Sequence, residues 1–241
     1  ILITSDKSYK NVEWTWGYRE NDRLGGLDPY SSSKACAELI IKSFYDSFLK
    51  NKKNLRIGIG RAGNVIGGGD WAEDRLVPDC MKSWHMDKTV NIRNPVATRP
   101  WQHVLEPLSG YLNLALNLSK SNHNNGEPFN FGPPSQQNHS VLEVVMEMSN
   151  YWDKVKWEIN CEATNIKECG LLKLNCDKAL SSLGWLSVWN FKETIYETVT
   201  WYKTFYESKN NINNNSTYEL TLEQIKRYTS KAQKLKLKWS L

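Results

Sequence analysis

The chain has 241 residues, of which 40% are hydrophobic, so it can bury a core of one or two lobes. No apolar run reaches the roughly 20 residues that a membrane-spanning helix needs, and no signal or transit peptide is recognisable. The net charge is +5, and residues 209–241 account for it with seven Lys or Arg and two acids. The remainder balances, 24 bases against 24 acids, which argues against a nucleic-acid-binding face.

The cysteines indicate a reduced, cytoplasmic environment. There are five of them, an odd number without CxxC spacing, so a disulfide framework is not expected. Cys161, Cys169 and Cys176 are spaced unlike known zinc ligands, and we therefore expect no metal site.

Taken in chain order, the patterning predicts an α/β fold. Residues 1–5 are a short apolar run rich in β-branched residues, typical of a buried parallel strand. A polar stretch punctuated by Gly and Pro follows, and then a helix that begins near Pro29. Further helices are predicted at 76–87, 106–119, 140–152, 177–183 and 191–207, and further strands at 55–60, 90–92, 101–104, 127–132, 155–159 and 171–175.

The tail after residue 208 is an Asn-rich linker followed by a short amphipathic helix. Its basic residues indicate either a solvated surface helix or contact with an anionic partner.

Two groups of residues point to acid/base chemistry. Tyr30 and Lys34 are four residues apart and share a face of the predicted helix, where a lysine ammonium makes a tyrosine phenol a usable acid or base. This spacing alone occurs at chance frequency. However, Asp6 and Lys7 directly follow the first predicted strand, at the end where open α/β sheets place their ligands.

One glycine pattern is a decoy. Gly58, Gly60 and Gly63 match the G-x-G-x-x-G pattern of dinucleotide-binding turns. The glycine-rich stretch 67–69 and Pro78 follow closely, so we expect no helix where a pyrophosphate would need one.

Four longer runs carry a far more specific resemblance. The chain resembles the extended short-chain dehydrogenase/reductases and, among them, the CDP-glucose 4,6-dehydratases, from residue 1 to about 207. The runs are TSDKSYKN, YRENDRLGGLDPYSSSKACAE, RAGNVIGGGDWAEDRLVPD and NPVATRPWQHVLEPLSGYL. The resemblance implies the C-terminal part of a Rossmann-like parallel sheet with a small α+β substrate-binding lobe. Residues 1–62 and 96–131 would form the NAD-binding remnant, residues 63–95 and 132–207 the lobe, and 208–241 a basic tail.

The resemblance also implies a redox-neutral dehydration of CDP-glucose that uses NAD. Tyr30 would take the C4 hydroxyl proton, Ser5 would hydrogen-bond that oxygen, and Lys34 would also anchor the cofactor. Asp6 would protonate the departing C6 hydroxyl, and Lys7 would remove the C5 proton. Lys7 is the discriminating residue, because the related dTDP-glucose enzymes have a glutamate there.

Further residues are assigned to the nucleotide sugar by the same resemblance. Asn64 would meet the diphosphate, and Leu76 and Val77 would contact the base through their backbone groups. Arg93 and Arg99 suit bidentate phosphate binding. His103 is expected to be a packed strand residue.

The resemblance places the enzyme in deoxysugar biosynthesis for lipopolysaccharide O-antigen. In such enzymes the glycine fingerprint and four strands would precede residue 1. We therefore expect a fragment that lacks most of its cofactor cradle and is inactive alone. Two alternatives stay open: another nucleotide-sugar epimerase or dehydratase, and a non-catalytic binding or oligomerisation fragment that forms homo-oligomers through the Tyr30 helix.

Overall fold

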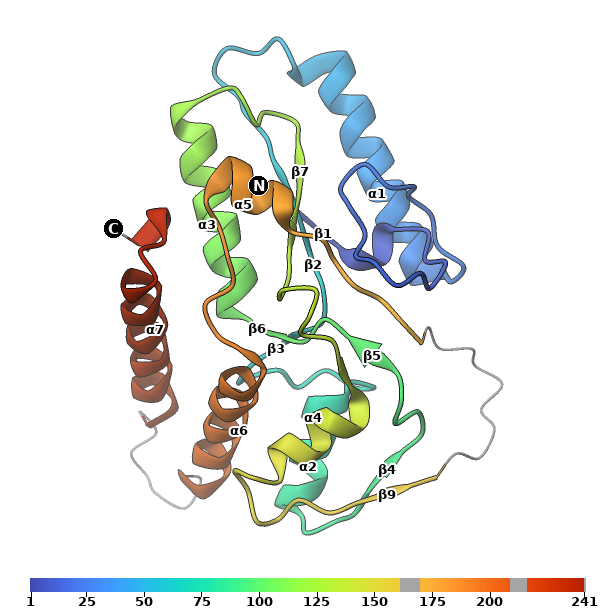
Figure 1. Cartoon of the computed structure of the whole chain (residues 1–241), viewed down its shortest axis with the longest axis vertical. Coiled ribbons are helices and arrows are strands. Elements are labelled where there is room, and N and C mark those ends of the chain that lie inside the picture. The colour runs from blue at the N-terminus through green and yellow to red at the C-terminus, as the bar shows by residue number, and fades with distance from the viewer. Residues whose placement is uncertain (161–169, 209–215, 241) are drawn as a thin grey trace.

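Three parallel strands form the central sheet of the computed structural model, which describes residues 1–160, 170–208 and 216–240 (Figure 1). The strands β1 (Leu2–Ser5), β2 (Ile59–Ala62) and β7 (Pro128–Phe131) lie in the order β1-β2-β7. Their register pairs Ser5 with Ala62 and Ala62 with Phe131. All three strands therefore end at the same edge, where parallel α/β sheets bind ligands.

Two long helices cover opposite faces of this sheet. Figure 1 shows α1 (Pro29–Phe44) on one side and α3 (Leu105–Lys120) on the other. A short π-helical segment, η2 (Tyr45–Leu49), extends α1. Gly60 allows close packing of α3 on β2, because a Cβ added there would lie 2.4 Å from the Tyr111 ring. Gly60 lies inside β2, and a strand, β3 (Val65–Ile66), follows Gly63 where a dinucleotide-binding turn would need a helix.

A second core lies beside the sheet and is built mostly from helices. It joins α2 (Leu76–His85), α4 (Val141–Met148) and α6 (Phe191–Ser208) around fully buried side chains such as Trp84 and Val199. Short strand pairs border this core. They are β3 (Val65–Ile66) with β6 (Gln102–His103), β4 (Val90–Ile92) with β9 (Trp157–Ile159), and β5 (Thr98–Arg99) with β8 (His139–Ser140).

The basic tail folds back onto the protein. Its helix α7 (Ser216–Lys234), followed by η3 (Lys238–Ser240), runs along α6. Arg227 pairs with Glu197 at 2.7 Å, and Lys231 pairs with Glu193. One face of this surface helix therefore packs on α6 of the same chain, which provides acidic partners for Arg227 and Lys231.

A buried carboxyl connects the tail to the rest of the fold. Glu106 accepts hydrogen bonds from the Val188 and Trp189 amides at 2.9 and 2.8 Å, and its Oε2 lies 2.7 Å from the Tyr228 hydroxyl of α7. Ser109 lies 2.9 Å from the same hydroxyl. The short helix α5 (Asp177–Leu183) packs nearby against α3 and β7.

Most predicted elements are present. The helix predicted at 76–87 begins at Leu76 as expected, with Pro78 in its first turn, where proline is tolerated. The strand predicted at 55–60 is shifted to Ile59–Ala62. The predicted strand at 171–175 is wrong: its backbone forms only an isolated bridge between Leu174 and Tyr18. The short strands β3, β5 and β8 were not predicted. Among the described residues, no helix is long and apolar enough to cross a membrane.

Glu106 generates a prediction about stability and pH. Burial raises its pKa from an ordinary value near 4.5 to about 7, so the folded state binds a proton more tightly than the unfolded state. The free energy of unfolding should therefore fall as pH rises from about 4.5 to about 7, by on the order of 1 kcal/mol per pH unit from this group. Urea unfolding of Glu106→Gln across this range should lack that component.

The exposed Glu223 of α7 provides a matched control. Its replacement, Glu223→Gln, should leave the slope of stability against pH as in the wild type. An identical slope in Glu106→Gln and the wild type would contradict the assignment.

Candidate active site

The end of β1 presents three predicted catalytic residues in one turn. Ser5 closes the strand, and Asp6–Ser8 form the 3₁₀ helix η1. The Ser5 hydroxyl accepts the Lys7 backbone N–H at 3.2 Å and lies 3.0 Å from Asp6 Oδ1, to which it donates. This side-chain cap fixes the turn. Below we call residues 5–7 the Ser5–Lys7 turn.

The helix that packs on this turn presents the other two. Asp28 caps α1 by accepting the Ser31 N–H at 2.9 Å, and Pro29 occupies the first helical position. Tyr30 and Lys34 follow on one face, with the Lys34 ammonium 5.6 Å from the Tyr30 ring centroid. Tyr30 is 51% exposed, so its phenol is accessible to a ligand.

The Lys7 ammonium acts on one carboxyl in the turn and on one at the start of the helix. Hydrogen bonds from Ser31 lower the pKa of Asp28, and the Lys7 charge adds to the lowering. The same ammonium also acts to lower the pKa of Asp6. The structure thus brings the Ser5–Lys7 turn together with the start of α1, which carries Tyr30 and Lys34.

Asp6 has an unusual environment for a carboxylate. Burial raises its pKa, against the opposing effects of Lys7, the Ser5 hydroxyl and Arg99. Its Oδ2 is buried without a hydrogen-bond partner among the described residues. A Cβ at Gly63 would lie 3.3 Å from this oxygen. Asp6 therefore retains its proton to a higher pH than an ordinary carboxyl, and one of its oxygens has hydrogen-bonding capacity left.

Two of the predicted substrate residues adjoin this edge. Asn64 lies between β2 and β3, half-buried, and its carbonyl accepts the Gln102 N–H at 3.0 Å. Arg99 ends β5 and is close enough to influence the Asp6 carboxyl. Its Nη1 donates to the Thr98 carbonyl at 2.8 Å.

The other predicted substrate residues lie in the second core or on the surface. Val77 is buried in the second core, and Leu76 is partly buried against it. Arg93 is exposed just after β4, and no contact among the described residues links it to the Ser5–Lys7 turn. His103 is confirmed as a packed residue: burial lowers its pKa to about 3, and its ring packs edge-to-face on Trp189.

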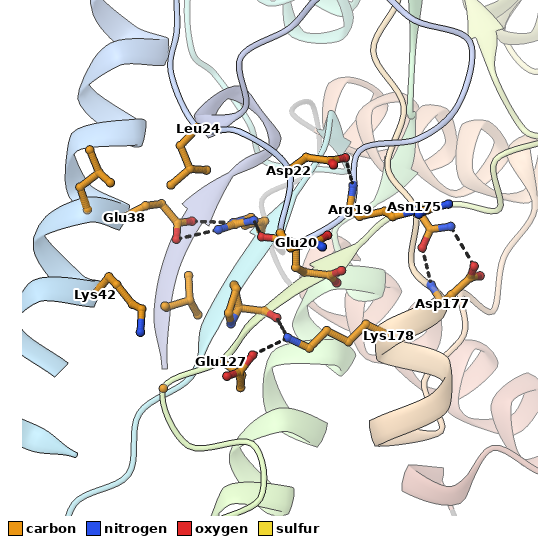
Figure 2. Close-up of a pocket in the computed structure, with 16 residues that line it drawn as sticks. Arg19, Glu20, Asp22, Leu24, Glu38, Lys42, Glu127, Asn175, Asp177 and Lys178 are labelled. Atoms are coloured by element: carbon orange, nitrogen blue, oxygen red, sulfur yellow. Dashed lines mark hydrogen bonds and ion pairs between the residues drawn. The ribbon is translucent and has the colours of Figure 1, made fainter. Parts of the chain in front are cut away.

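Sequence reasoning missed a cavity of about 670 Å³ at the opposite end of the strands (Figure 2). Ile59 and Pro128, the first residues of β2 and β7, contribute to its wall, and none of the predicted site residues lines it. Figure 2 shows Glu38 of α1 in this wall, together with the pairing of Lys178 and Glu127. The missed signal was charge inside buried elements, namely Arg61 in β2 and Glu38 in α1.

Sequence comparison gives the site a context. No protein-family model matches the chain. A CDP-glucose 4,6-dehydratase from Salmonella typhimurium is 47% identical over 210 residues, which cover 85% of this chain and 58% of that protein. The predicted resemblance to the CDP-glucose 4,6-dehydratases is confirmed. The chain spans less than two thirds of the length of this relative.

Solved structures share the fold. The dTDP-glucose 4,6-dehydratase from Bacillus anthracis, in complex with NAD, is 21% identical with a TM-score of 0.67, over 85% of this chain and 61% of that one. The UDP-glucuronic acid 4-epimerase from Bacillus cereus, in complex with UDP-glucuronic acid and NAD, is 17% identical with a TM-score of 0.70, over 84% and 60%. The predicted α/β, Rossmann-like fold class is therefore confirmed.

The environment of Asp6 predicts the effect of a neutral replacement on stability. Because burial raises its pKa, ionisation of Asp6 costs stability as pH rises above the ordinary value of 3.8. Asp6→Asn should therefore resist urea better than the wild type at pH 8, and this advantage should shrink at pH 4.

A surface carboxylate with the opposite shift provides the control. Hydrogen bonding and charge from Lys156 lower the pKa of the exposed Asp87, so its contribution is lost as pH falls rather than as pH rises. Asp87→Asn should show no gain at pH 8. A gain for Asp6→Asn that is equal at pH 4 and pH 8 would contradict our account of the Asp6 carboxyl.

Proposed function

We propose that this chain carries the catalytic side chains of an NAD-dependent lyase that converts CDP-glucose to CDP-4-keto-6-deoxyglucose. The supporting observation is that η1, which contains Asp6 and Lys7, packs on α1, which carries Tyr30 and Lys34. The 47% identity to a CDP-glucose 4,6-dehydratase supports the choice of substrate. Because the chain spans 58% of that relative, we propose the activity for the chain combined with the part of that protein that the match leaves uncovered.

The first half of the reaction uses Tyr30, Ser5 and Lys34. Tyr30 takes the proton of the C4 hydroxyl, and Ser5 hydrogen-bonds the same oxygen. A bound NAD would supply the acceptor for the C4 hydride and the source of the hydride for C6. The accessible Tyr30 phenol and the half-buried Lys34 ammonium beside it fit a ribose-bearing cofactor, and these two residues would hold it.

Elimination of water then uses the turn. The 4-ketone acidifies the C5–H bond, Lys7 removes this proton, and Asp6 protonates the departing C6 hydroxyl. Burial of the Asp6 carboxyl and its unpartnered Oδ2 support the role of proton donor. Lys7 must be uncharged to act as a base in this step.

The nucleotide sugar would bind between the sheet edge (1–62 and 96–131) and the lobe formed by 63–95 and 132–207. Arg99 would bind phosphate, since its guanidinium already lies near the Asp6 carboxyl. Asn64 would meet the diphosphate, Leu76 and Val77 would contact the base through backbone groups, and Arg93 would supply a second cation.

Two alternatives have support from specific observations. The fold is shared with a UDP-glucuronic acid 4-epimerase, but the Asp6–Lys7 pair is suited to an elimination that simple epimerases do not perform. A non-catalytic oligomerisation role is supported by apolar side chains exposed on α1 and η2. These are Leu39, Ile40, Phe44 and Phe48.

The decisive test is to incubate the purified chain with CDP-glucose and NAD and to analyse the nucleotide sugar by mass spectrometry. We expect no product from the chain alone, and a product that has lost one water once the part of the Salmonella relative that the match leaves uncovered is supplied. Asp6→Asn should lower its rate of formation by at least about 100-fold, because a positioned acid contributes about that much.

The control Glu223→Gln changes an exposed carboxylate far along the chain and should act as the wild type. A product of unchanged mass but altered stereochemistry would instead support an epimerase. If the supplemented wild-type chain neither dehydrates nor epimerises CDP-glucose, the proposed function is wrong.

A further inference from the structure

Both ends of the Ser5–Lys7 turn are tied to buried charged groups. Thr4 directly precedes the turn, and its hydroxyl donates to Glu38 Oε1 on α1. Tyr9 follows the turn, and its hydroxyl accepts from Arg61 Nη1 at 2.7 Å and donates to Asn130 Oδ1 at 2.7 Å. The turn is therefore held from α1 at one end and from β2 and β7 at the other.

The two charged groups also hold each other. Arg61 of β2 donates from Nε and Nη2 to the two carboxylate oxygens of Glu38, at 2.8 and 3.0 Å. Both side chains are only 3% exposed. Arg61 Nη1 additionally donates to the Glu20 carbonyl at 3.0 Å. This bidentate geometry fixes orientation as well as distance, which a single hydrogen bond does not.

The position of Glu38 along α1 connects the Glu38–Arg61 pair to the candidate catalytic residues. Lys34 lies four residues before Glu38 and Tyr30 eight residues before it, so all three lie along one face of the helix. A helix moves as a unit, and a shift at Glu38 would carry Tyr30 and Lys34 with it.

We propose that Glu38 is a positioning residue for the candidate active site. By binding Thr4 and Arg61 together, it holds Tyr30 and Lys34 of α1 in register with Ser5, Asp6 and Lys7. Its importance for catalysis rests on the proposed dehydratase function, whereas its control of the geometry does not. Arg61 and Thr4 are its partners in this arrangement.

The first test separates catalysis from binding. Thr4→Val removes one hydroxyl without changing side-chain shape or charge, and Glu38→Gln removes the charge that faces Arg61. In dehydration of CDP-glucose by the chain supplemented in the same way, we expect kcat to fall about tenfold or more, with KM within about twofold of the wild type. The reason is that small displacements of reacting groups lower the rate steeply, whereas the proposed substrate residues Asn64 and Arg99 lie on other segments.

The second test does not depend on activity. Reductive methylation with ¹³C-formaldehyde places NMR labels on lysines of the intact chain. In Thr4→Val we expect the Lys7 signal to move, because the end of β1 is released from α1. The Lys42 signal should stay in place. In the matched control Asp46→Asn, which breaks the exposed Lys42–Asp46 pair of the same helix, the Lys42 signal should move and the Lys7 signal should not.

These outcomes distinguish the two proposals. If the supplemented wild type does not dehydrate CDP-glucose, the proposed function fails, and the NMR result alone decides the role of Glu38. Circular dichroism must show each variant folded, and where Glu38→Gln does not fold, the milder Thr4→Val decides. An unmoved Lys7 signal in folded Thr4→Val, or an unchanged kcat in an active preparation, would overturn the inference.

Discussion

The buried ion pair between Glu38 and Arg61 is the interaction on which the rest of this arrangement depends. Two charges at 3% exposure are tolerated only when their hydrogen-bonding capacity is used. Thr4, Tyr9 and the Glu20 carbonyl use what remains of it. Because loss of one partner in such a pair typically costs about 3–5 kcal/mol, the pair selects one register of α1 against the sheet.

Local patterns explain what could be predicted from the sequence. The apolar run at 1–5 and the capped helix after Asp28 were both recognisable, and topology brings the end of a parallel strand close to the following helix. The meeting of the Ser5–Lys7 turn with Tyr30 follows from that topology. The Glu38–Arg61 pair could not be predicted in the same way, because its members are 23 residues apart on different elements. The strand predicted at 55–60 also ends one residue before Arg61, whereas the observed strand β2 includes it.

The amino-acid composition predicted the charge of the tail but not the partners of that charge. The basic tail indicated a solvated helix or contact with a foreign anion. In the structure, Glu193 and Glu197 of α6 pair with Lys231 and Arg227 of the tail. The predicted strand at 171–175 was wrong because its pattern reported burial and not what the segment packs against. Leu172 and Leu174 are buried at 1% and 2% exposure, so their alternation correctly reported burial. Burial came from packing around Tyr9 and Tyr18 rather than from a strand ladder.

Two buried carboxyls, Glu38 of α1 and Asp6 of the candidate site, show how hydrogen bonding distinguishes a structural from a chemical role. The two oxygens of Glu38 accept hydrogen bonds from Thr4 and Arg61, so little hydrogen-bonding capacity is left for a ligand. Asp6 has one oxygen bound by Ser5 and one buried oxygen that has no partner in the part of the chain that the structure describes. An unsatisfied buried polar atom costs free energy, and a fold keeps such an atom most readily where a ligand completes it. In the proposed reaction the C6 hydroxyl of the sugar is that ligand. Glu38, with all its hydrogen bonds made, would then hold α1 in the position relative to the sheet in which Asp6 can bind the C6 hydroxyl.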